Sequence, residues 1–163
     1  MRPVGAQGRN SFIGRDAELK RILRAVMEDH SHVILYGERG YGKTSLANLA
    51  MGAIRKAGLP VSRHVCSVGS DFDTIMRGLF RGMPLRSLDL ALPGTADGVQ
   101  NGEALLPPRP VRPADVVAVA TRFGGVRPVL VIDEFDRIAD DATRVSLADT
   151  IKQLSDESVG PFS

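Results

Sequence analysis

The chain has little of what extracellular and membrane proteins need. Its 163 residues include a single cysteine, Cys66, which excludes an internal disulfide and fits a reducing compartment. No apolar run approaches the roughly 20 residues that span a bilayer. Residues 1–10 carry basic side chains with no apolar stretch behind them, which argues against a secretory signal. We therefore expect a cytoplasmic protein without a membrane segment, long enough to bury the core of one domain.

An excess of charge of one sign is also missing. The 21 basic and 19 acidic residues leave a net charge of +2, which is too small to indicate a nucleic-acid-binding surface. Nucleic acid as a partner therefore has no support in this segment. The histidines at positions 30, 32 and 64 show no metal-ligand spacing with Cys66, and we interpret them as structural or exposed.

What the chain does have is an alternation of helical and strand patterns. Glycine and then proline end the second expected helix, at Gly58 and Pro60, in the usual order. Ser70 or Asp71 is expected to cap the third helix. The expected helices cover about 16–29, 43–57, 72–80, 114–123 and 141–154, and the expected strands cover 33–36, 60–68 and 129–132. Strands that alternate with helices predict an α/β fold with a parallel sheet covered on both faces, a three-layer sandwich.

Two stretches stand outside this alternation. Residues 1–11 are rich in glycine, arginine and polar side chains and are expected to form a flexible lead-in. Residues 83–112 contain five prolines and only short apolar pieces, so we expect a long loop or insertion. Such a segment is either a variable surface excursion or a partner-binding arm.

The segment Gly37–Ser45 carries a phosphate-binding motif. Residues 37–44 match G-x-x-x-x-G-K-[ST], the Walker A motif, between an expected strand and an expected helix. Glycines let successive backbone N–H groups point into one concavity, and the helix that begins near Lys43 directs its positive end at the same anion. We expect Lys43 to reach the β- and γ-phosphates and Thr44 to place its hydroxyl on Mg²⁺. The residues expected to bind the nucleotide are Gly37, Glu38, Arg39, Gly40, Tyr41, Gly42, Lys43, Thr44 and Ser45.

Two acids follow the last expected strand. Four apolar residues, 129–132, lead directly into Asp133 and Glu134, and an acid at the C-terminal end of a buried parallel strand faces the ligand crevice. Asp133 is expected to hold the Mg²⁺ shell, the Walker B role, and Glu134 to orient the attacking water. The extra strand 60–68, between the loop and these acids, and the absence of Asn-Lys-x-Asp favour ATP over GTP.

Three boxes together resemble a known family. Residues 12–19 (Phe-Ile-Gly-Arg-Asp-Ala-Glu-Leu), the loop 37–44 and residues 132–138 (Ile-Asp-Glu-Phe-Asp-Arg-Ile) are similar to those of AAA+ P-loop ATPases of the origin-recognition type and of STAND signalling ATPases. The resemblance implies that the backbone of Ile13, Gly14 and Arg15 lies beside the adenine. It also implies a homo-oligomer, because AAA+ sites are usually completed by a neighbour.

The resemblance implies later elements as well: a sensor 1 strand, an arginine finger and a helical lid. No counterpart follows Leu154, so we expect residues 12–163 to be a partial ATPase domain, incomplete at its C-terminal end. The expected function is ATP binding with magnesium-dependent hydrolysis, weak in this form. Two alternatives stay open, a STAND-like signalling switch and a non-catalytic nucleotide-binding module.

Overall fold

The computed structural model describes residues 15–38, 40–83, 101–123 and 127–158. The chain divides into two compact units, Met1–Lys56 and Ala57–Ser163. The phosphate loop, Gly37–Ser45, belongs to the first unit, and the acids at positions 133 and 134 belong to the second. Each unit has its own internal packing and is described by itself.

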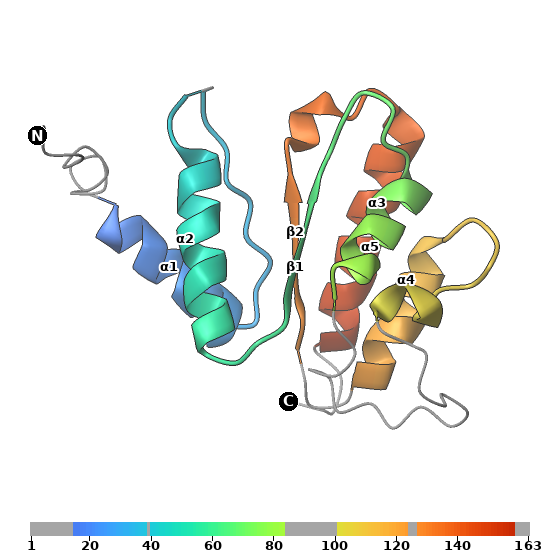
Figure 1. Cartoon of the computed structure of the whole chain (residues 1–163), viewed down its shortest axis with the longest axis horizontal. Helices are drawn as coiled ribbons and strands as arrows, with labels where there is room; N and C mark the ends of the chain where they lie inside the picture. The colour runs from blue at the N-terminus through green and yellow to red at the C-terminus, as the bar shows by residue number, and fades with distance from the viewer. Residues whose placement is uncertain (1–14, 39, 84–100, 124–126, 159–163) are drawn as a thin grey trace, which may run out of the picture. The chain divides into compact units, whose positions relative to one another are not determined.

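The described residues of the first unit form two helices and the segment between them (Figure 1). Helix α1 spans Asp16–Met27 and contacts helix α2, which spans Lys43–Lys56. Both were predicted from helical periodicity, and both are confirmed. Helix α2 buries one stripe of its surface, formed by Leu46, Ala50, Met51 and Ile54, whereas Leu49 on the predicted apolar face is 41% exposed.

The predicted strand at 33–36 does not form. This segment has no regular secondary structure, and Ile34 and Tyr36 are 79% and 91% exposed. Strands exist through hydrogen bonds to a neighbour, and no strand among the described residues pairs with this segment. The composition of this segment suits a strand, but a strand also requires a neighbouring strand to pair with.

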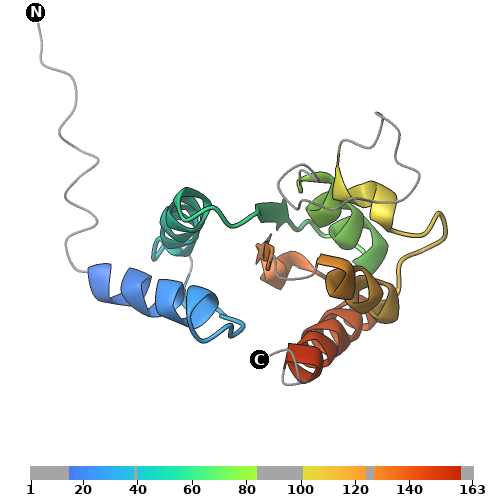
Figure 2. The same ribbon diagram turned by 90° about the horizontal axis from the view of Figure 1, so that it is seen from below.

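The second unit is built on two parallel strands. Strands β1 (Val61–Val65) and β2 (Val129–Asp133) pair in the register Val61↔Val129 to Val65↔Asp133. Three helices lie on one side of this sheet in Figure 1 and in the perpendicular view of Figure 2. They are α3 (Phe72–Arg81), α4 (Pro113–Ala120) and α5 (Asp141–Ser158). The predicted α/β class and parallel pairing are confirmed.

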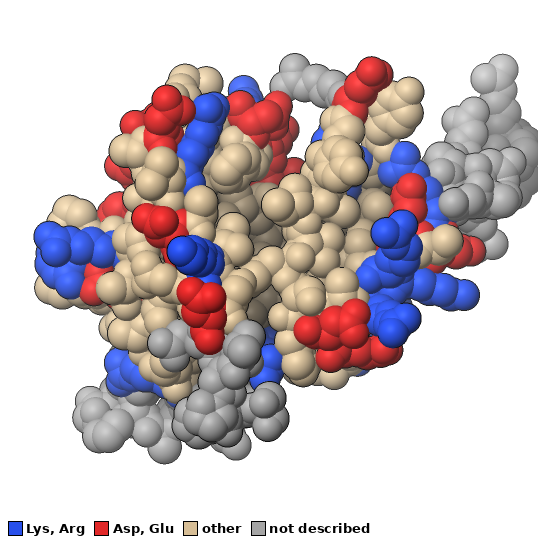
Figure 3. Space-filling model, turned by 180° about the vertical axis from the view of Figure 1, so that it is seen from behind, with Lys and Arg blue, Asp and Glu red and all other residues tan. Residues whose placement is uncertain are grey.

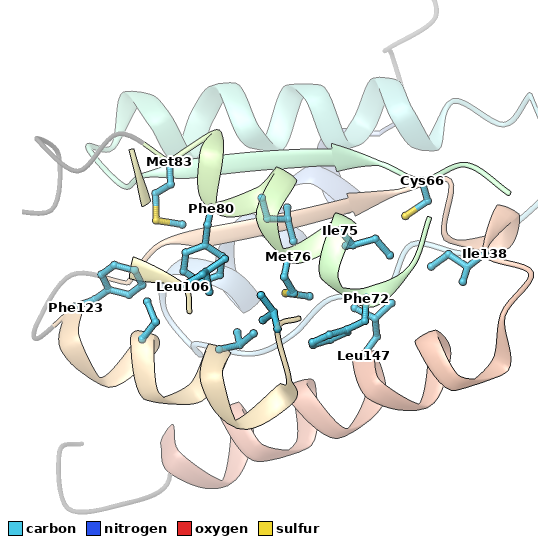
Figure 4. Packing of buried hydrophobic residues seen from close by; sticks show 14 residues of the cluster. Cys66, Phe72, Ile75, Met76, Phe80, Met83, Leu106, Phe123, Ile138 and Leu147 are labelled. Atoms are coloured by element: carbon cyan, nitrogen blue, oxygen red, sulfur yellow. The ribbon is translucent and has the colours of Figure 1, made fainter. Parts of the chain in front are cut away.

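A single apolar core joins these helices to the sheet (Figure 4). Helix α3 contributes the most to it, because five of its ten residues are buried, Phe72, Ile75, Met76, Leu79 and Phe80. The rings of Phe80 and Phe123 stack with centroids 6.4 Å apart. Phe123 belongs to the short 3₁₀ helix η3, Thr121–Phe123. Asp71 caps α3 by accepting a hydrogen bond from the Thr74 N–H at 2.8 Å, which selects it over Ser70.

The described part of the predicted loop at 83–112 is folded against this core. It includes the 3₁₀ helix η2, Gly102–Leu105, and buries Leu106 and Val111. Arg77 of α3 donates to the carbonyl oxygens of Pro107 and Arg109, each at 2.8 Å. Residues 101–111 are therefore part of the packed unit, while 84–100 lie outside the described residues.

Candidate functional site

The phosphate loop has the backbone conformation that its glycines predict. Gly37, Gly40 and Gly42 adopt φ values of +143°, +88° and +71°, which side-chain-bearing residues rarely reach. Lys43 begins α2 and returns over the loop, where its Nζ donates to the carbonyl oxygens of Gly37 at 2.6 Å and Glu38 at 2.8 Å. The lysine charge is therefore held against the loop at the N-terminal end of a helix.

The remaining loop residues are accessible. Tyr41 is 62% exposed, and Thr44 and Ser45 in the first turn of α2 are exposed as well. The first-turn N–H groups of a helix have no partner within the helix, so this end of α2 can accept an anion. Arg39, the remaining residue of the predicted loop site, lies outside the described residues.

Arg15, the residue that precedes α1, contacts the phosphate loop. Its guanidinium Nη2 donates to the Tyr41 carbonyl oxygen, and its Nη1 lies 3.2 Å from the point where a Cβ on Gly42 would stand. The box at 12–19 and the phosphate loop therefore meet through Arg15. Ile13 and Gly14 lie outside the described residues.

The acids at positions 133 and 134, which we call the acidic pair, stand at the C-terminal end of β2 and just beyond it. One Asp133 oxygen, Oδ1, accepts the Glu134 N–H at 2.9 Å, and the other, Oδ2, accepts from the Arg63 guanidinium. Glu134 adopts a left-handed conformation with φ 54°. Its Oε2 accepts from Arg137 Nη1 at 2.7 Å. Each acid is thus ion-paired with an arginine.

The sequence analysis assigned no site role to Arg63 or Arg137. A signal for Arg63 was present, because it is a charged residue in the middle of an expected buried strand, 60–68, where charge is rarely buried unless paired. The sequence did not predict Asp133 as its partner, because this pairing depends on which strand lies next to β1. Arg137 follows Glu134 by three residues, and the 3₁₀ helix η4, Phe135–Arg137, brings the two side chains together.

The half-buried His64 on β1 and the buried Cys66 just beyond it lie at this end of the sheet. The Cys66 N–H donates to the Asp133 carbonyl oxygen at 2.9 Å. Burial raises the pKa of the Cys66 thiol, and the negative charges of Asp133 and Glu134 raise it further, which keeps the thiol neutral. Burial lowers the pKa of His64, whose ring packs on Gly78 of α3.

The described residues carry charges of both signs on one face of the molecule. On the face in Figure 3, the described lysine and arginine side chains are interspersed with aspartate and glutamate. Among the described residues, no helix is long and apolar enough to cross a membrane.

Comparison with known proteins identifies the family. No curated protein and no solved structure matches the chain. The family described as AAA ATPase domain matches residues 11–160, a range that includes the phosphate loop, Arg15 and the acidic pair. This chain therefore belongs to the AAA ATPase domain family, which supports nucleotide binding as its general function.

Proposed function

We propose that this chain binds ATP through the phosphate loop and hydrolyses it with Mg²⁺. One observation carries the proposal: Lys43 Nζ is held by the loop carbonyls of Gly37 and Glu38 at the N-terminal end of α2. An ammonium group, the first-turn N–H groups of α2 and glycines with positive φ together form an environment suited to phosphate oxygens. Family membership supports the same ligand class.

Lys43 is proposed to exchange the two loop carbonyls for the β- and γ-phosphates. A phosphate oxygen carries more negative charge than a carbonyl oxygen, so the hydrogen bond from the ammonium group strengthens on exchange. The backbone N–H groups of Gly37–Ser45 would donate hydrogen bonds to the phosphate oxygens. Arg15, with Ile13 and Gly14, is proposed to border the nucleotide on the adenine side, and its bond to the Tyr41 carbonyl supports a position next to the loop.

The residues proposed for Mg²⁺ are Thr44 and Asp133. Magnesium prefers oxygen ligands and usually binds through one or two protein groups together with substrate phosphates and water. Thr44 supplies a hydroxyl oxygen and Asp133 a carboxylate oxygen, which are ligand types of this kind. When bound, the ion would neutralise charge on the phosphates during transfer.

Glu134 is proposed to orient the attacking water. Its left-handed backbone turns the chain directly after β2, and its carboxylate is 41% exposed beside Arg137. To accept a proton from water, the carboxylate has to be released at least in part from this arginine. Hydrolysis by the proposed site therefore includes a change in the Glu134–Arg137 pair.

The pairing of both acids with arginines favours a second candidate, a nucleotide-binding module without catalysis. In that case Asp133 and Glu134 contribute charge balance rather than chemistry. A STAND-like switch would lie between the two, with slow hydrolysis. A homo-oligomer is proposed from the family resemblance alone.

Calorimetric titration of the chain with ATP and Mg²⁺ tests nucleotide binding. Lys43→Ala is expected to weaken ATP binding at least about tenfold, because it removes a charge-assisted contact worth roughly 1.5–3 kcal/mol. Lys56→Ala, which removes an equal charge at the other end of α2, is the matched control and should bind like the parent. Equal affinity in both variants would refute the role of the loop.

Measuring phosphate release distinguishes an ATPase from a nucleotide-binding module without catalysis. Glu134→Gln is expected to retain ATP binding and to lose turnover by about 100-fold or more if Glu134 is a general base. If the parent chain binds ATP and releases no phosphate, and Glu134→Gln changes neither property, the chain is a binding module.

A further inference from the structure

The pairing of Arg63 with Asp133 follows from the register of the two strands. Arg63 lies opposite Val131, and Val65 lies opposite Asp133. Side chains alternate between the faces of a sheet, so Arg63 and Asp133 share one face. The residue before Arg63 on β1 faces the other side of the sheet, where the Ser62 hydroxyl donates to the Leu79 carbonyl oxygen of α3.

This ion pair is more enclosed than the neighbouring pair of Arg137 and Glu134. The Arg63 and Asp133 side chains are 27% and 17% exposed, against 46% and 41% for Arg137 and Glu134. An ion pair removed from water is screened less than a surface pair. The positive charge of Arg63 is therefore screened less at this carboxylate than the charge of a surface arginine would be.

The pair also engages an oxygen that a metal site would use. Asp133 Oδ1 already accepts the Glu134 N–H, and Oδ2 accepts from Arg63. A cation, or a water bound to it, approaching Asp133 must compete with the guanidinium for these oxygens. It must also approach a fixed positive charge.

We propose that Arg63 is a positioning residue that holds the Asp133 carboxylate and sets how much Mg²⁺ the site requires. The proposal rests on the proposed function of Asp133 as a magnesium ligand. Arg63 holds the carboxylate in one orientation, and it raises the metal concentration at which Asp133 takes up a cation. Binding of the metal–nucleotide complex is then coupled to loosening of a contact between β1 and β2.

The first test measures the Mg²⁺ concentration that half-saturates the magnesium-dependent gain in ATP affinity. Arg63→Gln is expected to lower this concentration about tenfold, because it removes one positive charge next to the site of a dication. Arg63→Lys retains the charge and should stay near the parent value. Arg122→Gln removes the same charge from an exposed position in η3 and should change nothing.

The second test needs no nucleotide. Mn²⁺ alone broadens the amide resonances of nuclei near it, and the concentration that half-broadens residues 131–134 is compared across the variants. Arg63→Gln should shift this concentration about tenfold downward, and adding Asp133→Asn should abolish the gain. Because this arm is independent of ATP, failure of the parent chain to bind ATP would sink the proposed function and leave the role of Arg63 testable.

The proposal is overturned if Arg63→Gln leaves the metal requirement unchanged or raises it in either test. Thermal unfolding of each variant checks that the sheet is intact. Should Arg63→Gln not fold, Arg63→Met, which is neutral but keeps an unbranched apolar stem, replaces it with the same expected shift and the same refuting result.

Discussion

Gly42→Ala is expected to destabilise the first unit and remove phosphate binding. Gly42 has φ +71°, and an L-residue in this left-handed region costs roughly 1–2 kcal/mol. The new methyl group would stand 3.2 Å from Arg15 Nη1. Because this atom is the end of a flexible side chain, the guanidinium shifts and its bond to the Tyr41 carbonyl, worth about 0.5–1.5 kcal/mol, weakens. We expect a total loss of about 2–3 kcal/mol.

Gly52→Ala is the matched control, since it is the same substitution within α2. A Cβ on Gly52 meets nothing within 4 Å, and alanine in a helix interior is more stable than glycine by roughly 0.5–1 kcal/mol. The two variants should therefore change the free energy of unfolding in opposite directions. In an Arg15→Ala background, the loss from Gly42→Ala should fall to the left-handed strain alone, about 1–2 kcal/mol.

Urea unfolding followed by far-ultraviolet circular dichroism measures both variants, and ATP titration measures the loop. Gly52→Ala should keep the ATP affinity of the parent, whereas Gly42→Ala should lose most of it. The reasoning is refuted if Gly42→Ala is as stable as Gly52→Ala, or if it binds ATP like the parent.

Two further predictions concern the second unit. The pKa of Asp71 lies below its usual value, chiefly because the Thr74 backbone N–H donates to the carboxylate. This contribution to stability is present above the unfolded pKa and is lost as pH falls through the folded pKa. Asp71→Ala should therefore lower the free energy of unfolding by about 1 kcal/mol at pH 7 and by progressively less in acid. Urea unfolding at several pH values measures this loss, and a pH-independent loss would contradict the cap. Gly78→Ala places a methyl group on His64 Nδ1, so its destabilisation should shrink in a His64→Ala background; additive losses in a double-mutant cycle would contradict this contact.

The local patterns of the chain were sufficient for most of its helices and for two of its strands. The α-helices α1 to α5 all begin within about one residue of the predicted positions. Residues close to each helix in the chain set its boundaries, such as Asp71 before α3 and Gly58 after α2. The predicted loop glycines also have the positive φ values that the motif requires. These features depend on neighbours in the chain, and local sequence suffices to specify them.

Two features could not be predicted from local patterns. The segment 33–36 has a strand-like composition and no strand partner. Residues 101–111 contain several prolines, yet they fold onto α3 through Arg77 and the burial of Leu106 and Val111. In both cases the outcome depends on whether a distant element supplies hydrogen bonds or an apolar surface, which local composition does not encode.

The sequence by itself determined the chemistry of the candidate site: a lysine and glycines in one loop, and two acids after one strand. Only the tertiary structure decided what those acids contact. Arg63 and Asp133 are separated by 70 positions, and their pairing exists because β1 and β2 are neighbours in a parallel register that places both side chains on one face. Motifs depend on adjacent residues, whereas the charge that surrounds a motif depends on which strands the fold brings together.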